Sequence, residues 1–382
     1  MFRKSITIFR LFGFEVKIDA SWLILAALII WTLAREFFPG AYPQLSTFIH
    51  WLMALAGTGG FVISIVFHEL CHSLVARRFG LPMKGITLFV FGGVAELTRE
   101  PENARAELFM AAVGPLSSLF LASVFLMLGK IIRLTGQSPA FTGVFAYLSL
   151  LNFALALFNL LPAFPLDGGR ILRSFLWTWK KDLVVATKIA SGAGVGFAFL
   201  LIISGLISLL TDRQVTGIWW ILIGLFLKSA AENSYRQVII QKLLEGQKVK
   251  YFMKPDPVTV APDVSVRDFI KHYVYVYHYH TFPVVQDNQL LGCLPVHALK
   301  GLGEEDWDKK TVRDFMEPCS PTNTIGPDED AGQVLTRMHR IGKSKFLVVE
   351  NERLVGILTL KDMLAFISLK IELEGIGHRR IL

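Results

Sequence analysis

Two histidines and one glutamate are the residues of this sequence best suited to chemistry. His68 and His72 are four residues apart, so on a helix both side chains lie on one face and can bind one metal ion. Glu69 follows the first histidine, close enough to polarise a water on that ion. An uncharged, apolar stretch begins at Trp51 and runs into the motif. This combination predicts metal-dependent hydrolysis inside a lipid bilayer.

A catalytic zinc site usually has three protein ligands and a water, so a third ligand must come from another segment. The best candidate is Asp167, which ends the run Asn159-Leu-Leu-Pro-Ala-Phe-Pro-Leu-Asp. Pro162 and Pro165 are expected to break the helix there, where a carboxylate has to reach a neighbouring helix. Glu232 is the alternative third ligand, because some membrane zinc proteases use a glutamate downstream of the histidine pair. The proline-broken helix favours Asp167.

The composition indicates a membrane protein that also has a water-soluble part. Hydrophobic residues make up 53% of the 382 residues and charged residues only 18%, which excludes a typical soluble protein. The apolar runs predict six membrane spans, in residues 20–37, 49–75, 107–129, 142–166, 189–210 and 215–229. The cysteines are odd in number and lack framework spacing, so no structural disulfide is expected.

The net charge of +8 reflects membrane orientation and not nucleic-acid binding, because the basic residues cluster at the ends of apolar segments. They lie before the first predicted span, between the second and third, between the fourth and fifth, and after the last. The positive-inside rule therefore places both termini and the C-terminal region in the cytoplasm of a multi-pass cell-membrane protein. No small-residue cleavage site follows Trp31, so the first span is expected to remain uncleaved.

The segment between the second and third spans differs in character from its neighbours. Residues 83–97 are rich in β-forming side chains, are interrupted by Gly92 and Gly93, and are too short to span a bilayer as a helix. Backbone that is not helical at membrane depth must be buried in protein or line a wet cavity. We therefore expect a membrane-associated β-hairpin beside the metal site. A plain cytoplasmic loop is the alternative.

The C-terminal part contains an internal repeat with an offset of about 64 residues. Phe252-Met-Lys-Pro recurs as Phe315-Met-Glu-Pro, and Phe282-Pro-Val-Val recurs as Phe346-Leu-Val-Val. Two copies of one α/β unit are therefore expected. The predicted organisation is a membrane domain in residues 1–230, a linker in 231–247, and the two copies in 248–302 and 311–370.

These features resemble the site-2 protease family of intramembrane metalloproteases, which pair a His-Glu-x-x-His helix with a later Asp-Gly motif. The resemblance covers residues 1–230. It implies that one zinc ion is bound by His68, His72 and Asp167, and that Glu69 is the general base. Asn159 matches a position that in the family helps to hold the substrate or the oxyanion. A hydrogen bond between helices is the alternative role for this asparagine.

The third predicted span also matches the family at Gly114-Pro-Leu, although Ser118 stands where members often have asparagine. Asn152 is interpreted as a hydrogen-bonding link between helices, and the glycine-rich run 192–196 as close helix packing. The implied reaction is hydrolysis of a peptide bond in a transmembrane helix, which must unwind because its carbonyls are hydrogen-bonded within the helix. The strand around Gly92–Gly93 is a plausible edge for the unwound segment.

The repeated units resemble cystathionine-β-synthase (CBS) domains, small α/β modules that pair and often bind adenine nucleotides between them. Members that bind nucleotide commonly carry Gly-x-x-Thr-x-x-Asp, which the second copy retains from Gly356 to Asp362. The resemblance implies that Asp362 accepts hydrogen bonds from the ribose of ATP or AMP and that Thr359 supports the phosphates. The first copy has Pro295 and Ala298 at the matching positions, so at most one site is expected. The alternative is a docking or dimerisation module in which Thr359 and Asp362 only cap a helix.

The sequence therefore predicts a polytopic α-helical membrane protein of about six spans with a β-hairpin, followed by a soluble α/β CBS pair. The predicted function is zinc-dependent intramembrane proteolysis of single-span membrane substrates, with regulation by adenine nucleotide and homodimerisation through the CBS domains. No nucleic-acid partner is expected. The main alternative is a catalytically weak membrane scaffold whose CBS pair binds partners. A CBS-gated transporter is disfavoured, because neither repeated spans nor paired ionisable residues along several spans are found.

Overall fold

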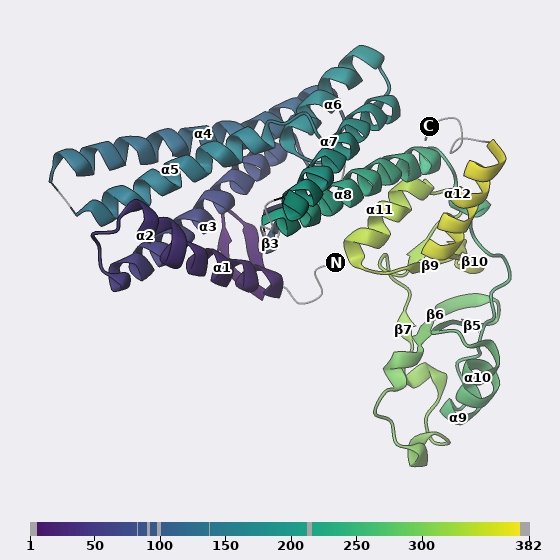
Figure 1. Ribbon diagram of the computed structural model, residues 1–382. Helices are drawn as coiled ribbons and strands as arrows, with labels where there is room; N and C mark the ends of the chain where they lie inside the picture. Colours follow the sequence, from purple (N-terminus) through teal and green to yellow (C-terminus); the bar gives the residue numbers. More distant parts are fainter. Residues whose placement is uncertain are drawn as a thin grey trace. The chain divides into compact units, whose positions relative to one another are not determined.

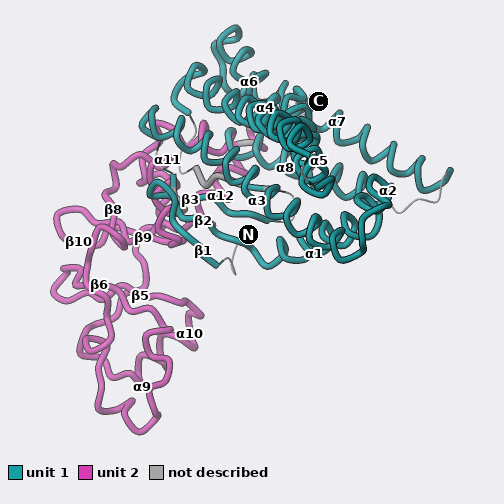
Figure 2. Tube along the Cα trace, turned by 90° about the vertical axis from the view of Figure 1, so that its left-hand side faces the viewer, with its two compact units in different colours: residues 1–238 teal, residues 239–382 magenta. Residues whose placement is uncertain are grey.

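The computed structural model describes residues 6–81, 83–89, 92–97, 101–136, 138–211 and 216–374. The chain divides into two compact units, Met1–Val238 and Ile239–Leu382, which Figure 2 draws in different colours. The first unit is mainly helical and carries a small β-sheet, whereas the second contains two three-stranded sheets with helices (Figure 1). Each unit has buried hydrophobic clusters of its own, as expected of a domain.

The sheet of the first unit combines the N-terminus with the predicted hairpin region. Its strands are β1 (Ile6–Leu11), β2 (Phe14–Ile18), β3 (Met83–Phe89) and β4 (Gly92–Leu97), in the order β1-β2-β3-β4. β1 and β2 are antiparallel around a turn in which Phe12 and Gly13 both have positive φ. β2 pairs parallel with β3, and β3 pairs antiparallel with β4. The depth of β3 and β4 in a membrane stays a prediction.

Five helices of the described chain are long and apolar enough to cross a membrane, judged by length and composition. They are Ala20–Ala41, made of α1 (Ala20–Thr32), a π-helical turn (Leu33–Phe37) and α2 (Phe38–Ala41), then α3 (Thr47–Arg78), α4 (Ala104–Leu134), α5 (Pro139–Asn159) and α7 (Leu183–Thr211). The sixth predicted span falls in α8 (Thr216–Leu244). This segment is helical, but its polar second half leaves too short an apolar stretch for it to count among the five.

The fourth predicted span, residues 142–166, is wrong at its C-terminal end. α5 ends at Asn159, residues 160–166 are not helical, and a further helix, α6 (Asp167–Lys180), begins at the proposed ligand. Pro162 and Pro165 lie in the break, as predicted, because proline cannot donate a helical hydrogen bond. α6 itself is absent from the prediction, since its 14 residues are too few for a membrane span.

Backbone packing around the break is close. A Cβ atom at Gly168 would collide with the carbonyl of Leu160, and one at Gly194 of α7 would collide with the carbonyl of Phe164. The predicted close packing of the glycine-rich run therefore holds at Gly194. It is wrong for Gly192 and Gly196, where a Cβ atom would meet nothing within 4 Å.

In the second unit the two copies are built alike. The first contains α9 (Val266–Phe269), a π-helical turn (Ile270–Val274), α10 (Tyr275–Tyr277), β5 (Thr281–Gln286) and β6 (Gln289–Pro295). β7 (Glu317–Pro318) comes from the start of the second copy but pairs with β6 in the sheet of the first. The second contains β8 (Thr324–Ile325), α11 (Ala331–Ile341), β9 (Lys345–Glu350), β10 (Arg353–Thr359) and α12 (Leu360–Glu374). Short 3₁₀ turns lie at Val249–Tyr251, Val296–Leu299, Glu304–Asp306 and Val312–Asp314. In each copy an antiparallel pair of six- and seven-residue strands forms the core of the sheet, as the repeat predicts.

Candidate metal centre

α3 carries the two histidines on one buried face. His68 and His72 are 4% and 6% exposed, and their Nε2 atoms lie 3.1 Å apart. This separation follows from the four-residue spacing, because residues i and i+4 are neighbours on a helix surface. The pair can therefore present two nitrogens to one ion.

Asp167 completes the group from a different helix. It is the first residue of α6, its side chain is buried, and its Oδ2 atom lies 3.2 Å from Nε2 of His68 and 3.2 Å from Nε2 of His72. The break between α5 and α6 thus places the carboxylate where the sequence predicts it. Glu232, the alternative ligand, lies in α8 and is not part of this group.

The three ligand atoms form a nearly equilateral triangle that fits a zinc ion. In a tetrahedral site with zinc–ligand bonds of about 2.0–2.1 Å, neighbouring ligand atoms lie about 3.3 Å apart. The measured separations of 3.1 and 3.2 Å are close to this value. Two imidazoles and one carboxylate are also a donor set used by catalytic zinc, which leaves a fourth position for water. Among the described residues, no other group of three or more histidine, cysteine or carboxylate side chains is so placed.

The other ring nitrogen of each histidine is held by α4. Nδ1 of His72 lies 2.5 Å from the carbonyl oxygen of Met110, and Nδ1 of His68 lies 2.9 Å from Oγ of Ser118. A carbonyl can only accept, so a neutral His72 donates from Nδ1 and keeps its lone pair on Nε2. That lone pair faces the carboxylate of Asp167, and a cation between them would remove the repulsion.

Gly114 of α4 leaves space beside the ligand nitrogens. A Cβ atom at this position would lie 2.7 Å from Nε2 of His68 and closer still to Nε2 of His72. A side chain here would therefore occupy the room that the ligands share. The Gly-Pro-Leu motif of the third span thus borders the site through its glycine.

Glu69 lies beside the group but does not belong to it. Its residue is half-buried, and a Cβ atom at Gly93 of β4 would lie 2.6 Å from its Cγ and 3.1 Å from its Oε1. Gly93 is therefore in direct contact with the carboxylate-bearing side chain. Glu69 is not one of the three clustered side chains, and its role as general base stays a prediction.

The two asparagines of α5 differ in their surroundings. Asn152 is fully buried, and its Nδ2 donates to Oγ of Ser64 on α3 at 2.9 Å, which confirms the predicted link between helices. Asn159 is the last residue of α5 and is half-buried at the start of the break. Only the non-helical segment 160–166 separates Asn159 from Asp167 along the chain. Its role in holding the substrate or the oxyanion stays a prediction.

The structure adds a buried ion pair that the sequence analysis missed. Glu107 of α4 is completely buried and accepts from Nε of Arg173 of α6 at 2.6 Å, and Arg173 is 1% exposed. Arg170 lies 3.9 Å from the same carboxylate. The available signal was Glu107 at the start of an apolar span, because an ionisable residue there is costly and needs a partner.

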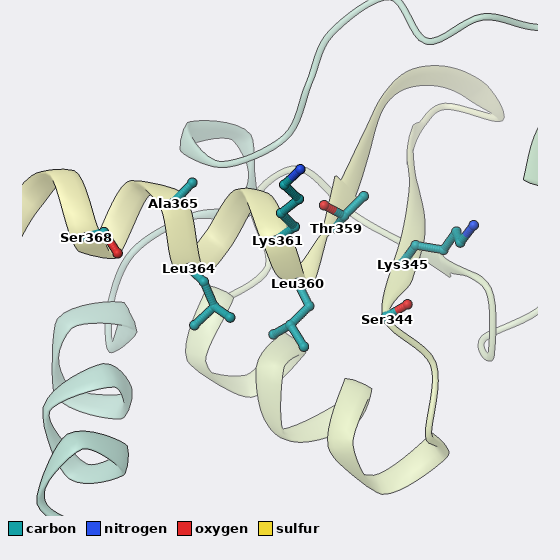
Figure 3. A pocket seen from close by; sticks show the side chains of 8 residues that line it. All are labelled: Ser344, Lys345, Thr359, Leu360, Lys361, Leu364, Ala365 and Ser368. Atoms are coloured by element: carbon teal, nitrogen blue, oxygen red, sulfur yellow. The ribbon is translucent and has the colours of Figure 1, made fainter. Parts of the chain in front are cut away.

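The second CBS copy contains a surface groove of 560 Å³ around the start of α12. Its lining comes from the end of β10, the start of β9 and one face of α12 (Figure 3): Ser344, Lys345, Thr359, Leu360, Lys361, Leu364, Ala365 and Ser368. Thr359, one of the predicted nucleotide ligands, therefore lines the groove. The amino group of Lys345 donates to Oγ1 of Thr281 at 2.9 Å, and burial lowers the pKa of this lysine below its usual value.

Thr359 and Asp362 also cap α12. Oγ1 of Thr359 accepts from the backbone N–H of Asp362 at 3.1 Å and donates to its carboxylate at 2.5 Å. The other carboxylate oxygen lies 3.1 Å from Nζ of Lys254. The helix-capping alternative thus has direct support, while the nucleotide role of both residues stays a prediction. In the first copy, Pro295 ends β6 and cannot supply the hydroxyl.

Comparison with known proteins finds two families along the chain. The peptidase family M50 matches residues 56–137 and 127–203, and the CBS domain family matches residues 249–300 and 312–369. Zinc metalloprotease MJ0392 of Methanocaldococcus jannaschii is 32% identical over 367 residues, which cover 96% of each chain.

Two solved structures resemble separate parts. The site-2 protease from Methanocaldococcus jannaschii is 31% identical and covers 60% of this chain and 94% of its own, with a TM-score of 0.42. The CBS domain of a bacterial CNNM/CorC family Mg²⁺ transporter in complex with ATP is 23% identical and covers 34% of this chain and 94% of its own, with a TM-score of 0.31.

Proposed function

Because this chain belongs to peptidase family M50, the site-2 protease family, and carries a CBS-domain pair, we propose that it is a zinc-dependent endopeptidase that cleaves transmembrane segments. The observation that carries this proposal is the triangle of His68, His72 and Asp167, buried among apolar helices with Glu69 beside it. Ionisable side chains inside a membrane are energetically costly, and they therefore usually mark a functional site.

The residues divide into two roles. His68, His72 and Asp167 would hold zinc, which supplies Lewis-acid polarisation of the scissile carbonyl and of water. Glu69 accepts a proton from the attacking water and returns it to the leaving nitrogen. Asn159, at the end of α5, is the candidate for holding the substrate or the oxyanion that develops on the carbonyl.

The substrate must expose a peptide bond that a helix would hide. β4 is an edge strand of the described sheet, and Gly93 brings it against Glu69. An unwound segment pairing with this edge would satisfy its backbone hydrogen bonds next to the general base. We therefore propose β4 as the surface on which a single-span membrane substrate is presented.

We propose that the second CBS copy binds an adenine nucleotide such as ATP or AMP in the groove lined by Thr359 and Lys345, which face each other on neighbouring strands. Asp362, whose carboxylate accepts from Thr359, would hold the ribose beside this groove. This requires the carboxylate of Asp362 to exchange Lys254 for ribose hydroxyls. The helix cap formed by Thr359 favours the alternative, a docking or dimerisation module for the CBS pair and a scaffold role for the chain. Both termini are proposed to be cytoplasmic, from the distribution of basic residues.

The proposal is tested with purified protein in detergent and a panel of single-span model substrates, each measured with and without a zinc chelator. Wild type is expected to cut and Glu69→Gln to be inactive although it binds zinc, since Glu69 is not one of the clustered ligands. Glu36→Gln, which neutralises an exposed glutamate of the first apolar helix, serves as the matched control and should cut like wild type. Equal cutting by Glu69→Gln would contradict the proposed base.

A further inference from the structure

One face of α4 contacts both histidines and the helix that carries the third proposed ligand. Glu107, Met110, Gly114 and Ser118 follow one another at intervals of three or four residues, so they form one stripe along the helix. All four are buried. The exposed residues of α4, such as Phe109, Leu116 and Phe120, lie off this stripe.

Two members of the stripe hold the histidines. Oγ of Ser118 lies 2.9 Å from Nδ1 of His68, and the carbonyl of Met110 lies 2.5 Å from Nδ1 of His72. Hydrogen bonds at the nitrogen away from a metal fix the orientation and tautomer of a ligand histidine. Between these two contacts, Gly114 leaves the space beside the two Nε2 atoms.

The same helix also contacts the middle of α6, the helix whose first residue is the third ligand. The carboxylate of Glu107 pairs with Arg173, and Oγ of Ser174 donates to the carbonyl of Ala104 at 2.6 Å. These residues lie two turns after Asp167 on a helix of only 14 residues. A displacement of α4 relative to α6 would therefore move the carboxylate relative to the two histidines.

From these contacts we infer that α4 sets the positions of all three metal ligands, and that Ser118 is a positioning residue for His68. The inference rests on the proposed function, because it takes the three clustered side chains as zinc ligands. Ser118 is well placed to show the effect, since it touches one ligand only and at the nitrogen that faces away from the shared space. Loss of the Ser118 hydroxyl should weaken zinc binding without removing any of the three atoms that bind the metal.

The experiment measures zinc affinity by competition with a chelator, and the absorption spectrum of the cobalt-substituted protein, in Ser118→Ala. Zinc affinity is expected to fall by about 10- to 100-fold, the usual effect of removing such a hydrogen bond. The ligand-field bands of cobalt should shift, because His68 is no longer held in one orientation. Ser123→Ala is the matched control, because this serine lies on the same helix but its hydroxyl donates to the backbone carbonyl of Leu119 in that helix. It should bind zinc like wild type.

A third variant separates the hydrogen bond from packing. Ser118→Thr keeps the hydroxyl and is expected to retain the wild-type spectrum and affinity. Unchanged affinity and spectrum in Ser118→Ala, or an equal loss in the alanine and threonine variants, would overturn the inference. Neither measurement uses a substrate, so the result does not depend on proteolysis. Wild-type protein that binds no zinc would overturn both this inference and the proposed function.

Discussion

Substituting Gly114 by alanine should remove the metal site while leaving the helices intact. The added methyl would lie 2.7 Å from Nε2 of His68, whereas a carbon and a non-bonded heavy atom prefer a separation of about 3.5 Å. His68 would therefore have to move by about 0.8 Å, and His72 by more, because its Nε2 is closer. Metal–ligand distances tolerate only about 0.2 Å. The required displacement thus exceeds the tolerance several-fold.

The assay is the zinc content of purified Gly114→Ala after equilibration with zinc, followed by cleavage of the substrate that wild type cuts. We expect no stoichiometric zinc and no chelator-sensitive cleavage. Gly192→Ala is the control, because a Cβ atom at Gly192 meets nothing within 4 Å. It should hold one zinc and remain active. If both variants melt at similar temperatures, loss of zinc in one of them is not due to unfolding.

Gly114→Ala that bound one zinc with wild-type affinity would refute the reasoning. It would mean that the ligand nitrogens do not lie against α4 at this point, and that the triangle of ligand atoms has another shape when zinc is bound. The contact of Ser118 with His68 would then lose its significance as well, since it belongs to the same stripe.

Three further predictions concern the base and the nucleotide groove. Gly93→Ala should lower kcat with unchanged zinc content, because its Cβ would lie 2.6 Å from Cγ of Glu69 and displace that side chain; metal analysis and steady-state kinetics test this. Asp362→Asn should weaken ATP binding by about 10- to 100-fold in calorimetry, the loss expected for hydrogen bonds to a charged group. Since burial lowers the pKa of Lys345, the free protein loses this proton at lower pH than an anion-bound form would. ATP affinity should therefore fall as pH rises from that lowered pKa toward the usual lysine value of about 10.4, and Lys345→Gln should abolish this pH dependence.

The parts of the site that follow from local spacing were predictable from the sequence. The four-residue interval of His68 and His72 fixes their common face whatever the surroundings, since it depends on helix geometry alone. Asp167 was predictable because two prolines end a helix before it. The repeat of the C-terminal unit was equally visible, and the strand lengths agree in both copies.

Features that depend on contacts between distant segments were not predictable. The β1–β2 hairpin is short, and Phe14 and Val16 are buried in a cluster with side chains of distant segments, such as Leu70 of α3 and Ile86 of β3. α6 is amphipathic and lacks the length of a span, so hydropathy does not detect it. The sixth expected span similarly lies in α8, a longer helix that is apolar in its first half and polar in its second.

Glycines make this limit concrete. In sequence, Gly114, Gly192 and Gly194 are three small residues in apolar spans, and close helix packing is the natural interpretation of each. In the structure they do different things: Gly194 packs on the backbone of the break, Gly192 meets open space, and Gly114 lies beside the ligand nitrogens. The chemistry therefore depends on the backbone of α4 approaching α3 closely at one residue. That approach depends on two helices together. The common face of the two histidines could therefore be predicted from one segment, whereas the shape of the site could not.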